Sequence, residues 1–203
     1  MVLYYIIDKK WVDRNLAKSD NHGTAKSIVE AFKEVLMEKD FKDIRIKDIT
    51  DAADLFRATF YTYFPDKYAI FDTILYEDLF NVVDSLVEAG MYKQSLEFIF
   101  NYFLNNREFY KRAFKYEGPD SCQHYLKAYL KEYFKTLIAK SSNKIKSEYK
   151  ELTNKDNFAE LCAETLFIVI NYIVTTDSDT EHIDRKIKAL HLFFTSGLKP
   201  FFE

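Results

Sequence analysis

Apolar residues recur at helical spacing along most of the chain, which divides into helices separated by short turns. In the first clear segment, apolar positions recur at i, i+3, i+4, i+7 and i+8, at Ile28, Ala31, Phe32, Val35 and Leu36. This spacing places them on one face of a helix. We therefore predict a helix that Asn21 or Thr24 caps and that ends at residues 39–41.

The next segment predicts two short helices joined by a tight turn. The first helix is indicated by apolar residues at Ile46, Ile49, Ala52 and Ala53. The turn is expected at Asp54-Leu55, and the second helix over residues 57–63. Such a pair forms a helix-turn-helix unit, whose second helix enters the DNA major groove. In that helix Ala58 and Phe60 are expected to face inward. The residues left for the outside are Arg57, Thr59, Tyr61, Thr62 and Tyr63.

Residues 66–88 predict one long fourth helix, which Gly90 ends. An aromatic-rich stretch follows over residues 92–133 and is interrupted by Gly118-Pro119. This stretch is either a packed core or the lining of a small-molecule cavity. After a polar connection at residues 140–157, a helix over residues 158–174 is apolar almost all round, and a last helix is predicted over residues 180–196.

These elements predict an all-α fold, and the 4 Gly and 3 Pro argue against an all-β one. We expect an N-terminal arm over residues 1–20, a three-helix DNA-binding domain over residues 21–65, and a larger helical domain over residues 66–203. The shared core of the three helices should hold Ile28, Phe32, Leu36, Ile46, Ile49, Phe60 and Phe64. The arm is either partly disordered, packed on a partner subunit or placed along a DNA groove, and the sequence leaves these alternatives open.

The net charge of -3 is unusual for a chain that binds DNA. The first 70 residues hold 12 basic and 12 acidic side chains, so the acidic excess lies in the remainder. DNA binding must then rest on the local placement of a few cations and not on a global field. Cys122 and Cys162 match no metal or redox spacing and are expected to be reduced and buried.

The segment ADLFRATFYTYFPDKYAIF resembles the signature of the TetR family of bacterial transcriptional regulators. Thr59-Phe60-Tyr61, Phe64 and Lys67 fall on the family's most diagnostic positions. The chain departs from the pattern where the family has glycine in the turn and a capping serine, because Asp54 and Phe56 stand there. A further common glycine is replaced by Asp40. Aspartate tolerates left-handed backbone, and Asp54 is the nearest residue to replace the lost cap.

The resemblance implies a homodimeric regulator, by default a repressor, that binds a palindromic operator in double-stranded DNA and responds to an effector. The expected DNA contacts are Thr24, Lys26, Arg45, Lys47, Arg57, Thr59, Tyr61, Thr62, Tyr63 and Lys67. Of these, Arg57, Thr59 and Thr62 would face bases. The expected phosphate contacts are Arg45, Lys47, Tyr61, Tyr63 and Lys67, with Thr24 and Lys26 also near a phosphate. The last two helices would pair with their copies in a second chain through Phe158, Leu161, Leu166, Phe167, Ile170, Ile187, Leu190 and Phe194.

The effector is expected to be a small apolar or aromatic molecule, held by Phe98, Tyr102, Phe109, His124, Tyr125 and Tyr129. The segment from Asn106 to Phe114 resembles the subgroup that includes regulators of dihydroxyacetone kinase operons, which implies that the effector is alternatively a protein. A second hypothesis is an interaction module of the same fold that works through a protein partner and not through tight DNA binding.

No pattern indicates an enzyme, a cofactor or a metal site. The four histidines form no HExxH helix, and the acidic cluster at residues 177–184 is explained by a helix start, where acidic side chains are favoured. No apolar run has the length of a membrane span, so a cytoplasmic location is expected.

Overall fold

The computed structural model describes residues 22–140 and 154–176, together with six isolated positions beyond them. Every element in these ranges is helical, as the all-α prediction requires. The predicted arm, most of the polar connection and the last helix, including Ile187, Leu190 and Phe194, lie outside the described residues. The chain forms two compact units, each described separately below. The first reaches Asp78 and includes Glu108–Leu126, and the second holds the remainder.

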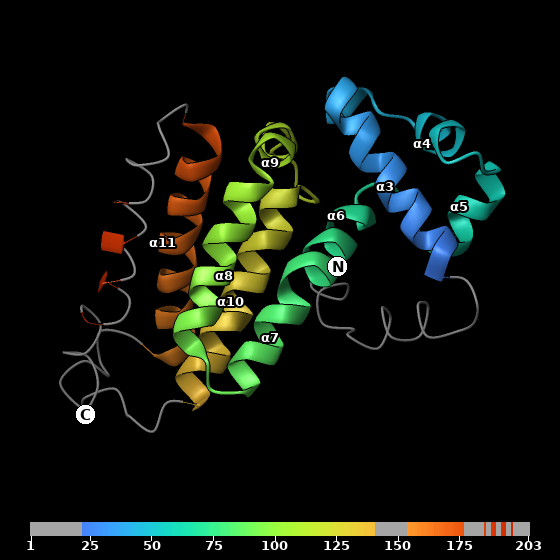
Figure 1. Ribbon diagram of the computed structural model, residues 1–203. Helices are drawn as coiled ribbons and strands as arrows, with labels where there is room; N and C mark the ends of the chain where they lie inside the picture. The colour runs from blue at the N-terminus through green and yellow to red at the C-terminus, as the bar shows by residue number, and fades with distance from the viewer. Residues whose placement is uncertain are drawn as a thin grey trace. The chain divides into compact units, whose positions relative to one another are not determined.

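The first unit is organised around α3 (His22–Glu38), which packs against α4 (Ile46–Ala52) and α6 (Ala69–Leu75) (Figure 1). Its predicted apolar face is buried throughout, and Ile28, Phe32 and Leu36 are fully enclosed. Because α3 begins at His22, Thr24 lies inside its first turn and does not cap it. The other predicted cap, Asn21, lies outside the described residues.

The helix-turn-helix pair consists of α4 and α5 (Arg57–Tyr63), which contact each other. A short 3-10 turn, η1 (Phe41–Asp43), precedes them. The predicted core residues Ile49, Phe60 and Phe64 are buried. Ile46 is only half-buried, because it opens α4 at the edge of the core.

The predicted fourth helix is divided into three parts. The Asp66 carboxylate accepts hydrogen bonds of 2.9 Å from the backbone N–H groups of Tyr68 and Ala69, and α6 begins there. A π-helical turn, η2 (Tyr76–Phe80), separates α6 from α7 (Asn81–Glu88). After this turn Val83 and Val87 are buried, while Val82 is exposed.

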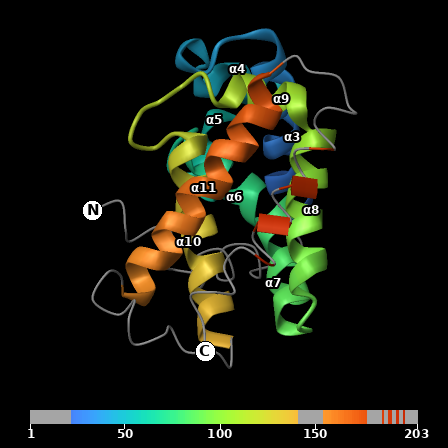
Figure 2. The same ribbon diagram turned by 90° about the vertical axis from the view of Figure 1, so that its left-hand side faces the viewer.

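In the second unit α7 packs on α8 (Tyr92–Asn105), and α8 packs on α11 (Lys155–Thr175) (Figures 1 and 2). Gly90, with φ of 74°, ends α7 as predicted. The C-terminal part of α10 (Cys122–Lys140) is joined to α11 by two ion pairs, Lys127–Glu164 and Lys131–Glu160. The helix α9 (Arg107–Ala113) belongs to the first unit from Glu108 on.

Candidate nucleic-acid interface

The turn between α4 and α5 is built from backbone hydrogen bonds and one left-handed residue. The Leu55 N–H donates to the Thr50 carbonyl at 2.9 Å, and Asp54 has a φ of 53°. Asp54 is the non-glycine residue with positive φ in the described part of the chain, so aspartate does supply the left-handed turn. Asp40 instead has extended backbone, with φ of -65°, and no glycine is needed there.

The recognition helix α5 begins without a side-chain cap. Its N-cap residue is Phe56, which has extended backbone and a side chain with no capping group. The expectation that Asp54 would replace the missing serine is therefore wrong, because Asp54 is occupied in forming the turn two residues earlier. The phenyl ring of Phe56 is 83% exposed.

One side of α5 is anchored in the core and the other is presented to solvent. Phe60 is fully buried, whereas Arg57, Tyr61 and Thr62 are exposed. The Arg57 guanidinium donates to the Tyr61 hydroxyl at 3.0 Å and stands 5.6 Å from the centre of its ring. This i, i+4 pair holds two long side chains in a defined arrangement before any ligand arrives.

Three other residues of α5 have intermediate or unexpected positions. Thr59 and Tyr63 are half-buried, so each offers only part of its side chain to a ligand. Ala58 is exposed, which corrects its predicted inward position. Its carbonyl accepts a hydrogen bond from the Thr62 hydroxyl at 3.3 Å.

The start of α4 carries basic residues and a fixed carboxylate. Arg45 and Lys47 are exposed. The Asp48 carboxylate accepts hydrogen bonds from Lys39 at 2.8 Å and from the Arg45 backbone N–H at 2.7 Å. The hydrogen bond from Lys39 is the main reason why the pKa of Asp48 lies below its ordinary value. The side chains of Arg45 and Lys47 remain available for phosphates.

Lys67, a predicted phosphate contact, makes several contacts within its own unit. Its ammonium donates to the carbonyls of Phe41 at 2.6 Å and Ile44 at 2.7 Å. It also lies 4.4 Å from the centre of the Phe41 ring. Partial burial lowers the pKa of Lys67, and Asp43 and Asp48 oppose this shift. The geometry thus makes Lys67 a clamp that holds η1 and the start of α4.

Sequence reasoning missed an aromatic cluster beneath this clamp. The Phe41 ring contacts the rings of Tyr68, Phe71 and Tyr116 at centroid distances of 4.9 to 5.2 Å. A hydrogen bond with Tyr116 raises the pKa of Tyr68. Tyr116 is distant in sequence, and no local pattern linked it to the helix-turn-helix. Gly118, two residues later, makes room for this ring, because a Cβ atom there would overlap Tyr116.

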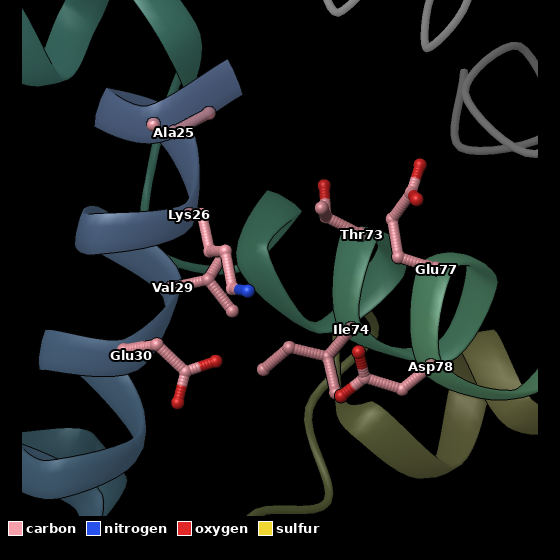
Figure 3. A pocket seen from close by; sticks show the side chains of 9 residues that line it. Ala25, Lys26, Val29, Glu30, Thr73, Ile74, Glu77 and Asp78 are labelled. Atoms are coloured by element: carbon pink, nitrogen blue, oxygen red, sulfur yellow. The ribbon is translucent and has the colours of Figure 1, made fainter.

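A cleft of about 390 Å³ lies between α3 and the α6–η2 segment. Figure 3 shows Lys26 and Glu30 on one wall and Thr73, Ile74, Glu77 and Asp78 on the other. Lys33, next to this wall, pairs with Glu30 at 3.1 Å and with Asp78 at 2.9 Å. Lys26, a predicted phosphate contact, is exposed among these carboxylates, and Thr24 is half-buried nearby in sequence.

The six predicted effector residues are not brought together around this cleft. Phe109, His124 and Tyr125 belong to the first unit. Their partners in the predicted set, Phe98, Tyr102 and Tyr129, belong to the second. The effector site stays a prediction.

Burial differs sharply among these aromatic side chains. His124 is exposed, whereas Tyr125 is 5% exposed. Tyr129 stacks on Phe80 with ring centroids 4.7 Å apart. Tyr133 is also buried and bonds to the Ser95 hydroxyl at 2.9 Å, and burial raises the pKa of Tyr133 to about 12. These contacts are those of a packed aromatic core.

The predicted dimer interface on α11 stays a prediction. Four of its residues are buried in the single chain, namely Phe158, Leu166, Phe167 and Ile170. They have little surface left to give to a second chain. The exposed apolar side chains of α11 are Leu161, at 63% exposure, and Ile168, at 65%. Leu161 is one of the predicted dimer residues, and Ile168 is not.

Among the described residues no group of three His, Cys, Asp or Glu side chains is placed to hold a metal ion. Cys122 and Cys162 are free and buried as expected, and burial raises the pKa of the Cys162 thiol to about 11. The helix α11 has the length and apolar composition of a membrane span, but half of its apolar window is buried, as in the core helix of a globular domain.

Two families match adjacent parts of the chain. Residues 28–74 match the family described as bacterial regulatory proteins, tetR family. Residues 91–182 match a family described as transcriptional regulator C-terminal region. Both are families of regulators and not of enzymes. The first match contains the complete α4–turn–α5 unit.

Individual proteins agree with these matches. The chain is 26% identical over 91 residues to the HTH-type dhaKLM operon transcriptional activator DhaS of Lactococcus lactis, a match that covers 45% of this chain and 49% of DhaS. It is 32% identical over 83 residues to the uncharacterized HTH-type transcriptional regulator YxbF of Bacillus subtilis, covering 40% of this chain and 20% of YxbF. The chain thus spans half or less of the curated relatives it matches.

The fold is also that of a solved structure. The dihydroxyacetone kinase operon activator DhaS superposes with a TM-score of 0.64 at 20% identity, over 89% of this chain and 98% of that one. The matched residues 28–74 contain the helix-turn-helix, with Phe60 buried and the Arg57–Tyr61 pair exposed. The chain belongs to the TetR family of bacterial transcriptional regulators.

Proposed function

We propose that this protein is a transcriptional regulator that binds double-stranded DNA through α5. The observation that carries the proposal is the two-sided character of α5: Phe60 is fully buried, and the Arg57–Tyr61 pair is presented to solvent. Anchoring fixes the helix on the domain, and ordered donors on its outer side suit phosphates and base edges.

The proposed contacts follow from exposure. Arg57 and Thr62 are exposed and would reach base edges, with Thr59 contributing its accessible part. Arg45 and Lys47 are exposed at the start of α4 and would hold phosphates. The remaining proposed contacts with the DNA backbone are Thr24, Lys26, Tyr61, Tyr63 and Lys67. Because Lys67 already bonds two carbonyls, its share of phosphate binding should be small.

The proposed active species is a homodimer on a palindromic operator. Leu161 and Ile168 leave two large apolar side chains of α11 in water, and a second copy of the chain would cover them. Symmetry would then set two recognition helices about 34 Å apart, on successive major grooves of one face of the DNA. Repression by blocking a promoter is the predicted default. Activation is the alternative, because the relative DhaS is named as an activator.

The decisive experiment selects bound duplexes from a random library at physiological salt and then measures affinity for the selected site. Arg57→Ala should lower that affinity roughly tenfold or more, as expected for loss of an arginine contact with a base. Lys93→Ala is the control, because Lys93 is an exposed lysine on α8 in the other unit. Equal affinities of the Arg57→Ala variant and the wild type would refute the proposed interface.

The exposed Phe56 specifically favours one alternative, an interaction module that contacts a protein partner. That alternative predicts no enrichment of any duplex over non-specific binding. The proposed regulator predicts an enriched palindrome, whose position in the genome would identify the controlled operon. Reporter expression from that promoter, with and without the protein, would give the sign of regulation.

A further inference from the structure

Phe56 occupies a position where its side chain contributes nothing to the folded chain that the structure describes. It is 83% exposed, and among the described ring contacts it takes part in none. By contrast, Phe60 contacts both Tyr61 and Phe64 at centroid distances of 5.6 and 5.8 Å. The apolar side of α5 is therefore complete without the phenyl ring of Phe56.

The backbone at Phe56 would accept a capping residue without change. Its φ of -76° and ψ of 144° are those of an ordinary N-cap, where serine, threonine, aspartate or asparagine stabilises a helix. The chain thus gives up a cap and also leaves a large apolar ring in water. The position of Phe56 at the start of the recognition helix suggests a use for its side chain outside the free protein.

We propose that Phe56 reads a thymine through van der Waals contact with its 5-methyl group in the major groove. This inference rests on the proposed function. In a helix-turn-helix the N-terminal residues of the second helix approach base edges, and Phe56 directly precedes Arg57 there. A phenyl ring has no hydrogen-bonding group, and the thymine methyl is the apolar group that the major groove offers. Phe56 is thus a specificity-determining residue beside the proposed base contact of Arg57.

The proposal predicts the composition of the operator. Each half-site should contain a thymine adjacent to the base pair that Arg57 contacts. Replacing that thymine with deoxyuridine removes only the methyl group and keeps base pairing. We expect this change to weaken wild-type binding about fourfold, which is the equivalent of about 0.8 kcal/mol for one buried methyl group.

The test measures affinity for the selected duplex with each half-site thymine replaced in turn by deoxyuridine, for the wild type and for Phe56→Ser. At one thymine the wild type should lose about fourfold, whereas Phe56→Ser should bind both duplexes equally. Phe56→Leu keeps an apolar side chain and should retain part of the discrimination. Arg57→Ala is the matched control, which should bind all duplexes more weakly and still discriminate between thymine and deoxyuridine.

Thermal unfolding of the same variants provides a second readout. Phe56→Ser restores a capping hydroxyl and should unfold at a higher temperature than the wild type while losing the methyl discrimination. A gain in stability together with a loss of specificity is not expected of a structural residue.

Several outcomes would overturn the proposal. A selected half-site without thymine would refute it, as would equal sensitivity to deoxyuridine in the wild type and Phe56→Ser. In both cases selective DNA binding persists, so the proposed function stands and only the role of Phe56 fails. Absence of any selective binding by the wild type would overturn both together.

Discussion

Replacing Lys67 with methionine should destabilise the first unit, because the ammonium holds η1 against the helix-turn-helix. The Nζ atom lies 2.6 Å from the Phe41 carbonyl oxygen and 2.7 Å from that of Ile44. It also faces the rings of Phe41 and Tyr68, at 4.4 and 5.7 Å from their centroids. Methionine keeps the apolar stem and removes the charge and every donor.

The magnitude follows from these contacts. A hydrogen bond to a charged group contributes roughly 1.5 to 3 kcal/mol, and a partly exposed cation–π contact roughly 0.5 to 1 kcal/mol. Partial burial of the ammonium works against these gains, and this burial is the main reason why the pKa of Lys67 is lowered. The carbonyls freed by the substitution can also be hydrated in part. We therefore expect a net loss of about 2 kcal/mol in the free energy of unfolding.

Urea unfolding followed by circular dichroism measures this loss, and Lys42→Met is the matched control. Lys42 is an exposed lysine on the same 3-10 turn, and its replacement should change stability by less than about 0.5 kcal/mol. Salt-dependent DNA binding separates the two roles of Lys67. A phosphate contact would reduce the salt slope by about one unit with little effect on stability. Equal unfolding free energies for Lys67→Met and Lys42→Met would refute the clamp.

Three further predictions concern the same unit. Asp48→Asn should make the free energy of unfolding depend less on pH in acid. The hydrogen bond from Lys39 lowers the pKa of Asp48 in the folded protein. The stabilisation by ionised Asp48 is therefore present above its ordinary pKa of 3.8 and is lost as pH falls through the lower folded pKa. Urea midpoints at pH 7 and pH 3 should therefore differ more for the wild type, and an equal difference for both proteins would contradict this. Asp54→Gly should raise the unfolding free energy by about 0.5 kcal/mol, because glycine adopts the left-handed backbone of this residue without steric strain. A lower thermal unfolding temperature for Asp54→Gly would contradict this strain. Gly118→Ala should cost about 1 to 3 kcal/mol through overlap with the Tyr116 ring. That cost should largely disappear in a Tyr116→Ala background, and an undiminished cost in the double-mutant cycle would exclude the overlap.

Hydrophobic periodicity was sufficient to predict α3 and its buried face, because a long helix on one core imposes a strict repeat. It failed at η2, where a π turn changes the angular position of every later residue. After this turn Val82 is exposed, while Val83 and Val87 are buried. A π turn shows no residue type of its own, so the predicted single helix over residues 66–88 could not be corrected from sequence.

At the candidate interface, the family signature identified α5, but single side chains depended on tertiary contacts. The exposure of Arg57 and Tyr61 follows from their spacing around the buried Phe60. The clamp formed by Lys67 could not be predicted, because its acceptors are main-chain carbonyls more than 20 residues away. No sequence pattern marks which carbonyls point outward from a turn.

The aromatic cluster explains why sequence and packing divide this chain differently. By sequence, Tyr116 lies within the region matched at residues 91–182, but by contact it belongs to the unit that contains the helix-turn-helix. Its ring meets Phe41 and Tyr68, the two rings that also face the Lys67 ammonium. Support for the turn before α4 therefore comes from a segment that the C-terminal region supplies. A change that displaces Tyr116 should reach the clamp through direct contact, so stability and DNA affinity should fall together in Gly118→Ala.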